Sequence, residues 1–383
     1  MRLLIAPDSF AGTLSAVAAA DAIAAGWLSV SPHDEVTVRP MSDGGPGFVQ
    51  VVATALGAEL VETSVTGPMG DEVPAVIALH DGTGYVEAAQ ACGLDLVPVA
   101  KRDPEESTSF GVGELIRAAI RSGATTVVVG LGGTATNDGG AGMLAALGAT
   151  ADGALDSGPR RFTRLRRIDL APALAAVDGI NIVVATDVDI PLLGLRGAAR
   201  SFAPQKGADD AQVMRLESAL EQVHELLGPR ESDGKDAAVM LGAGAAGGLG
   251  YALLRLGGRR VPGIATVMDI VGVPELVGEC DLVITGEGKF DWQSLRGKVV
   301  SGIAAVATDD AKPCIVMAGQ VLVGRREYSA MGVAAAYSVS DFAGSPEASL
   351  ADPVGTLTAA AARVAGTWSA RANRTSRERS SGG

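Results

Sequence analysis

The stretch from Val127 to Gly148, VVVGLGGTATNDGGAGMLAALG, constrains the fold more than any other part of the sequence. It begins with three consecutive valines, an all-apolar run that is typical of a strand buried on both faces. A glycine-rich turn follows, and then Met143, Leu144 and Leu147 have the spacing of a helix that ends at Gly148. A buried strand, a glycine-rich turn and a helix in this order predict an α/β sheet.

The glycine-rich turn has the composition of a phosphate-binding loop. Glycines allow a close approach of the backbone, and the N–H groups and positive dipole end at a helix start favour an anion. We therefore interpret the turn as a nucleotide phosphate cradle, with Asn137 and Asp138 at its mouth. A tight strand-to-helix turn without a ligand is the better explanation for a single glycine loop taken alone. The candidate cofactor-binding residues are Gly132, Gly133, Thr134, Asn137, Asp138, Gly139 and Gly140.

Length and charge exclude several classes of protein. The 383 residues, 47% of them hydrophobic, are enough for two domains that each bury a core. The net charge of −13 disfavours binding to nucleic acid or to an anionic membrane. Three widely spaced cysteines indicate neither a disulfide framework nor a zinc site, so we expect a cytoplasmic protein. The first apolar run is too short for a signal peptide, and no stretch has the length of a membrane span.

The segment from residue 58 to 99 differs in pattern from the rest of the chain. It contains three strand-like runs, residues 60–65, 75–79 and 84–87, which are separated by turn signals and not by helices. This pattern predicts an antiparallel or mixed sheet, so we expect the first domain to break near Gly57.

Acidic residues follow four predicted strands, and they indicate phosphoryl transfer. They are Asp8, Asp43, Asp187 and Glu287. Phosphoryl transfer needs donors and cations around the phosphates, Mg²⁺ between their oxygens and a group that positions the attacking hydroxyl. Carboxylates suit Mg²⁺, and Asp187 and Asp189 could face one ion. Further backbone donors are expected from a loop that contains Gly286, Glu287 and Gly288.

A second glycine pattern supports a different function. Gly242, Gly244 and Gly247 have the spacing of a dinucleotide fingerprint, and Asp269 lies about where a ribose-binding acid would fall. The alternative function is therefore an NAD-dependent oxidoreductase. However, no histidine or lysine is placed as an obvious proton donor beside a hydride acceptor.

Six motifs, taken in order, closely resemble the glycerate kinase type I family. They are APDSF, SDGGPG, GLGGTATNDGGAG, the segment from Thr186 to Gly194 with FAPQKGA, GAGAAGGLG and TGEGKFDWQSLRGK. The resemblance covers roughly residues 1 to 365, and six ordered motifs are far more specific than one glycine loop. The sequence departs from the usual pattern of this family at three positions. It has Ala11, Pro46 and Ile190 where lysine, glutamate and asparagine, respectively, are common.

The resemblance implies a fold and a reaction. The fold has two α/β domains, one flavodoxin-like with a parallel sheet and one mixed-sheet domain inserted into it, with the active site in the cleft between them. We expect residues 1–57 with 262–370 to form the first, 58–261 the second, and 371–383 a disordered tail. The reaction is transfer of the ATP γ-phosphate to D-glycerate with Mg²⁺, usually at the 2-hydroxyl to give 2-phosphoglycerate, with 3-phosphoglycerate as the alternative product, by a monomer or homodimer.

We hypothesise roles for the candidate site residues on this basis. Asp187 is the first choice for positioning or deprotonating the hydroxyl and Asp8 the second, and either could hold Mg²⁺ instead, with Asp189 beside Asp187. Lys206 is a further candidate catalytic residue, which would bind phosphate or the glycerate carboxylate. A non-catalytic sugar-acid or nucleotide-binding protein remains an alternative because of Ala11. The candidate substrate-binding residues are Ser9, Asp43, Gly44, Gly45, Asp291, Arg296 and Lys298.

Overall fold

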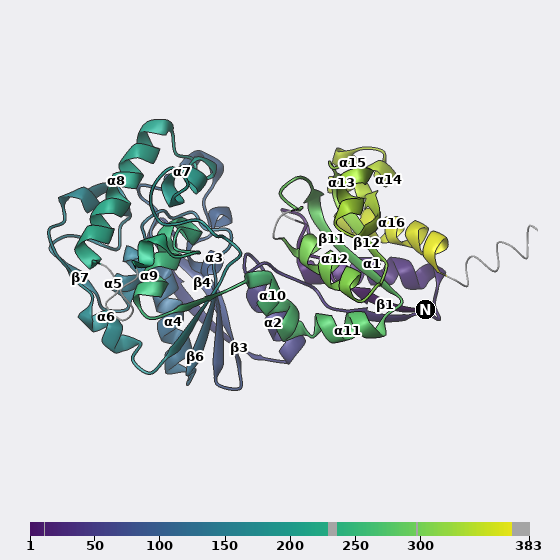
Figure 1. The fold of residues 1–383 in the computed structure, drawn as a ribbon, viewed down its shortest axis with the longest axis horizontal. Coiled ribbons are helices and arrows are strands. Elements are labelled where there is room, and N and C mark those ends of the chain that lie inside the picture. The colour runs from purple at the N-terminus through teal and green to yellow at the C-terminus, as the bar shows by residue number, and fades with distance from the viewer. Residues whose placement is uncertain (11, 229–235, 296–297, 370–383) are drawn as a thin grey trace, which may run out of the picture. The chain divides into compact units, whose positions relative to one another are not determined.

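The computed structural model describes residues 1–10, 12–228, 236–295 and 298–369, which form two compact units. The first unit combines Met1–Asp43 with the chain from Ile264 onward, and the second is Gly44–Gly263. The second unit is therefore an insertion in the sequence of the first (Figure 1).

The first unit is built on a five-stranded parallel sheet. Its strand order is β13-β12-β11-β1-β2, and every neighbouring pair is parallel. This is the order 2-1-3-4-5 of a flavodoxin-like doubly wound sheet, so the predicted fold class is confirmed. The strands are β1 (Arg2–Ile5), β2 (Glu35–Val38), β11 (Leu282–Phe290), β12 (Cys314–Val321) and β13 (Val333–Ser338).

Two long helices cover one face of this sheet. Helix α1 (Ala16–Val30) begins at Ser15, whose hydroxyl accepts a hydrogen bond from the N–H of Ala18 at 3.2 Å, as its N-cap position predicts. It packs with α16 (Pro353–Trp368) over alternate apolar residues of β1 and β11, such as Ile5 and Ile284. The other helices of this unit are α10 (Gly263–Val271), α11 (Val273–Glu279), α12 (Val299–Asp309), α13 (Arg325–Ala330), α14 (Val339–Ala343) and α15 (Pro346–Ala351).

The second unit contains the mixed sheet that the sequence predicts. Its order is β10-β9-β6-β5-β4-β3, in which β3, β4 and β5 pair antiparallel and the pairs from β5 to β10 are parallel. The strands are β3 (Glu59–Thr66), β4 (Glu72–His80), β5 (Thr83–Glu87), β6 (Thr126–Gly130), β9 (Asn181–Ala185) and β10 (Arg259–Val261). A short pair, β7 (Thr150–Ala151) with β8 (Ile168–Asp169), stands apart.

Helices of the second unit pack against this sheet through one core. The core joins Val127 and Val129 of β6 to Leu115, Leu144 and Leu249 from three helices. No helix in the described part of the chain is both long and apolar enough to cross a membrane. The helices are α2 (Phe48–Leu56), α3 (Ala88–Cys92), α4 (Phe110–Arg121), α5 (Ala141–Ala146), α6 (Ala171–Ala176), α7 (Ala198–Phe202), α8 (Asp210–Leu227) and α9 (Leu249–Arg255).

The first division between the units falls earlier than the expected break near Gly57. The compact units separate between Asp43 and Gly44, so α2 belongs to the second unit. Glu87, at the end of β5, accepts hydrogen bonds from the N–H groups of Gly47 and Val49 and so ties the start of α2 to this unit. Gly57 is a left-handed C-cap that ends α2, and such a glycine marks a helix end rather than a domain boundary.

Strand β11 is longer than the sequence indicates. We expected a glycine-rich loop from Gly286, but this prediction is wrong, because the strand continues to Phe290 in register with β12. A Cβ atom at Gly286 would overlap the carbonyl oxygen of Met317 on β12. The glycine therefore permits close strand pairing and does not form a turn.

We predict opposite effects for two glycine substitutions in the paired helices α1 and α16. A Cβ at Gly26 would overlap the carbonyl oxygen of Thr358 and lie 2.8 Å from the Cβ of Ala361, so Gly26→Ala should lower the free energy of unfolding by roughly 1–3 kcal/mol. Gly366→Ala meets no atom within 4 Å and should raise it by about 0.5–1 kcal/mol. Urea unfolding of both variants measures the difference, and equal midpoints would show that α1 and α16 do not pack as described.

Candidate functional site

Asp8 lies at the position where a flavodoxin-like sheet binds its ligands. It follows β1, and its backbone N–H donates to the carbonyl oxygen of Gly286 on β11 at 2.8 Å. Strands β1 and β11 are the neighbours at the topological switch point of the 2-1-3-4-5 order, outside whose carboxyl ends ligands bind. The N–H of Ser9 donates to Oδ1 of Asp8 at 2.6 Å and holds the carboxylate in place.

Three acidic side chains of the first unit interact at this sheet edge. Burial, followed by the charges of Asp43 and Glu287, raises the pKa of the Asp8 carboxyl to about 8, against the hydrogen bond from the N–H of Ser9 and the charge of Lys298. Burial also raises the pKa of Glu287, against a hydrogen bond from Ser294 and the charge of Lys298. Oε1 of Glu287 is buried and has no hydrogen-bond partner among the described residues. The cluster therefore favours a cation or a hydrogen-bond donor from a ligand.

In the second unit, the loop from Leu131 to Gly140 has much of its backbone satisfied by the protein. The N–H of Gly132 donates to the carbonyl oxygen of Gly44 at 3.1 Å, and the N–H of Gly139 donates to that of Gly247 at 3.0 Å. The N–H of Gly140 donates to Oδ1 of Asp138 at 3.0 Å. These three amides, which we expected to face phosphate, already have protein acceptors in this conformation.

Asp138 stabilises this loop from within. Its side chain is fully buried, and Oδ2 accepts hydrogen bonds from the N–H of Ser109 at 2.8 Å, the hydroxyl of Ser109 at 2.8 Å and the N–H of Gly142 at 3.2 Å. Our placement of Asp138 at the mouth of the loop is therefore wrong. Its negative charge already occupies the start of α5, the end of the helix that would attract an anion.

Two polar side chains of this region, those of Asn137 and Lys206, are buried. Asn137 is fully buried, and neither atom of its amide has a hydrogen-bond partner among the described residues. The ammonium of Lys206 is buried and donates to the carbonyl oxygen of Thr136 at 2.5 Å, with Oγ1 of Thr134 at 3.4 Å. Burial lowers the pKa of Lys206 to about 8, against the charge of Asp138.

The two predicted metal ligands after β9 differ in their surroundings. Asp187 follows Thr186 and is partly buried. Asp189 is 63% exposed, and its Oδ1 pairs with Nη2 of Arg260 at 2.5 Å. Arg260 therefore neutralises Asp189 in this structure, and a cation shared by Asp187 and Asp189 stays a prediction. Among the described residues, no three Asp, Glu, His or Cys side chains are grouped as a metal site.

The glycine pattern at residues 242 to 247 serves packing. A fingerprint needs a strand that leads to its first glycine, whereas the segment before it, Ala237–Val239, is a 3-10 helix. A Cβ at Gly247 would overlap the carbonyl oxygen of Thr136, and one at Gly248 would lie 2.7 Å from the Cα of Gly139. The prediction of a dinucleotide site is therefore wrong, and these glycines allow two loops to touch.

The remaining candidates divide between the units. Gly44 and Gly45 lie against the start of the loop after β6, where a Cβ at Gly132 would overlap the Cα of Gly45. Asp291 and Lys298 flank the carboxylate cluster of the first unit and act on Glu287 electrostatically. Arg296 and the residues of the expected tail from 371 to 383 lie outside the described residues, as does Ala11.

Sequence analysis missed two residues that shape these sites. Glu87 holds the start of α2 and Ser109 binds Asp138, whereas Ser294, which lies in the motif TGEGKFDWQSLRGK, is buried beside Glu287. Serine and glutamate at strand or helix ends have many uses, so their types alone did not single them out. The run Ser107–Thr108–Ser109 before α4 was the available signal, because adjacent hydroxyls before a helix often bind a neighbouring loop.

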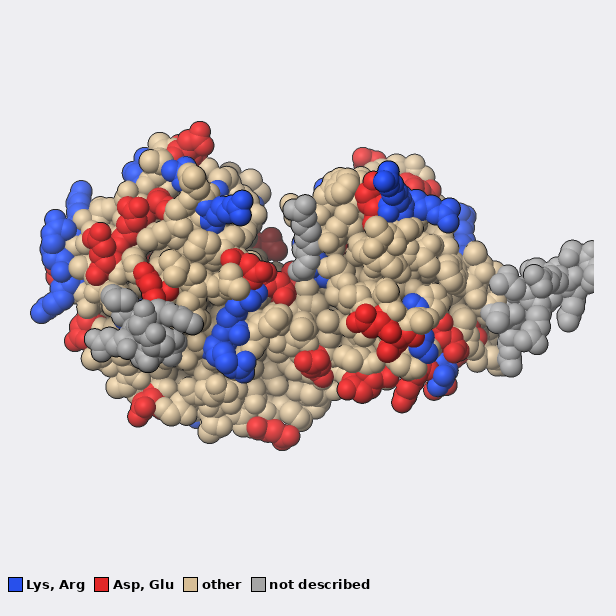
Figure 2. Space-filling view, viewed as in Figure 1, with Lys and Arg blue, Asp and Glu red and all other residues tan. Residues whose placement is uncertain are grey.

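Figure 2 shows acidic side chains distributed over the face in view of both units, in keeping with 44 acidic against 31 basic residues. An excess of negative charge makes each buried carboxylate more costly to ionise.

We predict that Asp8→Asn stabilises the ligand-free protein and that the gain increases with pH. The folded-state pKa of about 8 lies above the ordinary value of 3.8, so between these values the unfolded chain releases a proton that the folded chain retains. Ionisation then favours unfolding increasingly as the pH rises from about 4 to 8, and asparagine removes this penalty. Thermal unfolding at several pH values measures the effect, with the exposed Asp178→Asn as control. A gain that does not change with pH would show that Asp8 is not held protonated.

Comparisons with known proteins agree with these features. Residues 3–369 match the sequence profile of the Glycerate kinase family. The glycerate 2-kinase of Escherichia coli is 42% identical over 88% of this chain and 90% of its own, and the glycerate kinase of Bacillus subtilis is 39% identical over 88% and 90%. A crystal structure assigned to glycerate kinase 2 of Salmonella typhimurium superimposes with a TM-score of 0.78 at 36% identity, covering 96% of this chain and 98% of that one. The chain belongs to the glycerate kinase family.

Proposed function

We propose that this protein transfers the γ-phosphate of ATP to the 2-hydroxyl of D-glycerate and releases 2-phosphoglycerate and ADP. The family supports a kinase acting on glycerate, and the name of the Escherichia coli relative supports the 2-hydroxyl over the 3-hydroxyl. The observation that carries the proposal is the group of carboxylates around Asp8 at the switch point of the flavodoxin-like sheet. Phosphoryl transfer depends on such positioning and electrostatic groups more than on covalent chemistry.

Asp8 is the proton acceptor in this proposal. As the glycerate hydroxyl attacks the γ-phosphorus, its proton passes to a carboxylate oxygen of Asp8 while the bond from phosphorus to the β,γ-bridging oxygen breaks. A general base is most effective when its pKa lies near the working pH, and a pKa of about 8 satisfies this condition. The unpartnered Oε1 of Glu287 accepts a hydrogen bond from a substrate hydroxyl and so orients glycerate.

Cationic side chains would balance the phosphate and carboxylate charges of the substrates. Lys298 lies in the electrostatic field of Asp8 and Glu287 and would bind a phosphate or the glycerate carboxylate, with Arg296 as a further candidate. Lys206 acts indirectly, because its ammonium is buried against the carbonyl oxygen of Thr136 and holds the loop that presents Asn137.

The residues present fit Mg²⁺, which binds through one or two carboxylates and keeps several waters. Asp187, partly buried after β9, would hold the ion, whereas Asp189 is committed to Arg260. The ion held there would supply positive charge to the phosphate oxygens and so offset the negative charge that develops on them. The three cysteines are all free and buried, which supports the proposal of a reducing cytoplasm.

The reaction is tested by incubating the purified protein with ATP, MgCl₂ and D-glycerate and measuring ADP release. We expect release that requires glycerate, and a phosphorus NMR signal that assigns the product to the 2-position. Release without dependence on glycerate would contradict the glycerate kinase activity, and a 3-phosphoglycerate signal would contradict only the position.

We predict that Asp187→Asn lowers turnover by about 10²- to 10⁴-fold with little loss of folding stability. The carboxamide keeps the shape of the side chain but removes the charge that would bind the ion or position the hydroxyl. Initial-rate kinetics with ATP and D-glycerate measure the effect, and thermal unfolding checks the fold. Asp189→Asn is the matched control, because its carboxylate pairs with Arg260 and its loss should change the rate little. A near-normal rate for Asp187→Asn would show that Asp187 neither binds the ion nor positions the hydroxyl.

A further inference from the structure

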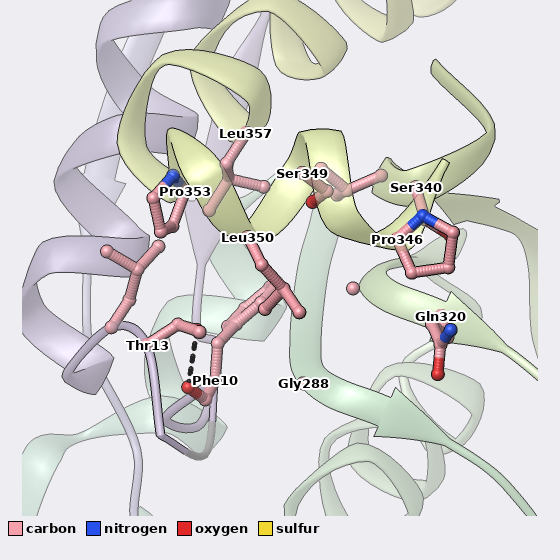
Figure 3. Close-up of a pocket in the computed structure, with 13 residues that line it drawn as sticks. Phe10, Thr13, Gly288, Gln320, Ser340, Pro346, Ser349, Leu350, Pro353 and Leu357 are labelled. Atoms are coloured by element: carbon pink, nitrogen blue, oxygen red, sulfur yellow. Dashed lines mark hydrogen bonds between the residues drawn. The ribbon is translucent and has the colours of Figure 1, made fainter. Parts of the chain in front are cut away.

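A hollow of about 130 Å³ lies in the first unit and has no role in the site described above. It sits where β11 and β12 extend past the end of β1, and α15 and α16 close it from the other side (Figure 3). Leu350 and Leu357 point into it from these helices, and Phe10 lies opposite them. Gly288 and Gly319 form part of its wall, so a ligand would contact backbone atoms there instead of side chains.

The lining is apolar with a few neutral polar groups. None of the 13 described residues that line it is charged, and the polar side chains come from Thr13, Gln320, Ser340 and Ser349. Gln320 brings an amide, which can both donate and accept, to the edge of the hollow (Figure 3). A cavity of about 150 Å³ with apolar walls takes up a benzene ring, so this volume suits a flat, uncharged ring that is partly exposed.

This hollow and the carboxylate cluster lie at the end of the same strand. Glu287 belongs to the cluster, and Gly288, the next residue of β11, lines the hollow. Neighbouring residues of a strand face opposite sides of the sheet, so the two sites are separated by the edge of β11. The loop after β1 also contributes to both sites, because Asp8 belongs to the cluster and Phe10, two residues later, lines the hollow.

We propose that this hollow binds the adenine base of the nucleotide, whose ribose and phosphates then cross the edge of β11 toward Asp8 and Lys298. The proposal rests on the proposed kinase function and names the nucleobase pocket of that site. Adenine is flat and uncharged, with donors and acceptors along its edge that Gln320 can pair. Glycerate does not suit this hollow, because a buried anion needs a cation and no described lining residue carries one.

Two substitutions test the pocket by different means. Ser349→Tyr fills it, and Gln320→Ala removes the amide while leaving the wall in place. We expect Gln320→Ala to raise the KM for ATP about tenfold, the effect of one lost hydrogen bond, and Ser349→Tyr to raise it more. The KM for glycerate should stay within about twofold in both. Ser329→Tyr, on an exposed position of α13 in the same unit, is the matched control for adding a tyrosine.

Binding of mant-ADP, followed by fluorescence with excess adenosine as competitor, gives a readout that needs no turnover. Displacement by adenosine and loss of binding in Ser349→Tyr, with circular dichroism like that of Ser329→Tyr, support the pocket. An active protein whose two variants keep the KM for ATP and the mant-ADP affinity of the control overturns the pocket and leaves the kinase function intact. If the protein does not phosphorylate glycerate, mant-ADP binding still decides: binding that Ser349→Tyr abolishes supports the pocket, and no binding or unchanged binding overturns it.

Discussion

The parallel pairing of β1 with β11 is the interaction on which the first unit depends. It joins Leu3, Leu4 and Ile5 to Leu282, Val283 and Ile284, across the whole inserted second unit. Because the backbone of Asp8 continues this pairing by donating to Gly286, the first acidic residue of the chain is held beside a carboxylate that follows 279 residues later. This pairing is what brings Asp8 and Glu287 close enough to interact electrostatically.

The cluster of carboxylates lowers the stability of the folded protein, and it supplies groups that can take part in a reaction. Gathering Asp8, Asp43 and Glu287 at a partly buried edge raises the pKa of Asp8 and Glu287, which means that the folded state disfavours their ionised forms. Such a cost is typical of active sites, where a ligand's cations and donors supply what the protein leaves unpaired. The buried Oε1 of Glu287 has no partner among the described residues and is likewise left for a ligand. In the second unit, the buried amide of Asn137 also has no partner among the described residues.

The glycine-rich loops illustrate how one composition supports two interpretations. From the sequence, the loop after β6 was a phosphate cradle and the 242–247 segment a possible dinucleotide fingerprint. The structure places these two loops against each other, with Gly139 donating to Gly247 and a Cβ at Gly247 overlapping Thr136. Glycine removes side chains for a neighbouring backbone as readily as for a ligand, and only the tertiary contacts distinguish the two.

The sequence by itself determined the local elements, the sheet classes and the family. The run of three valines placed β6, the spacing of Met143, Leu144 and Leu147 indicated α5, and the run of turns after residue 58 indicated antiparallel pairing. These features depend on residues within a few positions of one another. The tertiary structure decided which polar residues remain available, because Arg260 takes Asp189, Ser109 occupies Asp138 and β12 extends β11 through Glu287. Each of these partners lies far away in the sequence, so no local pattern could assign it.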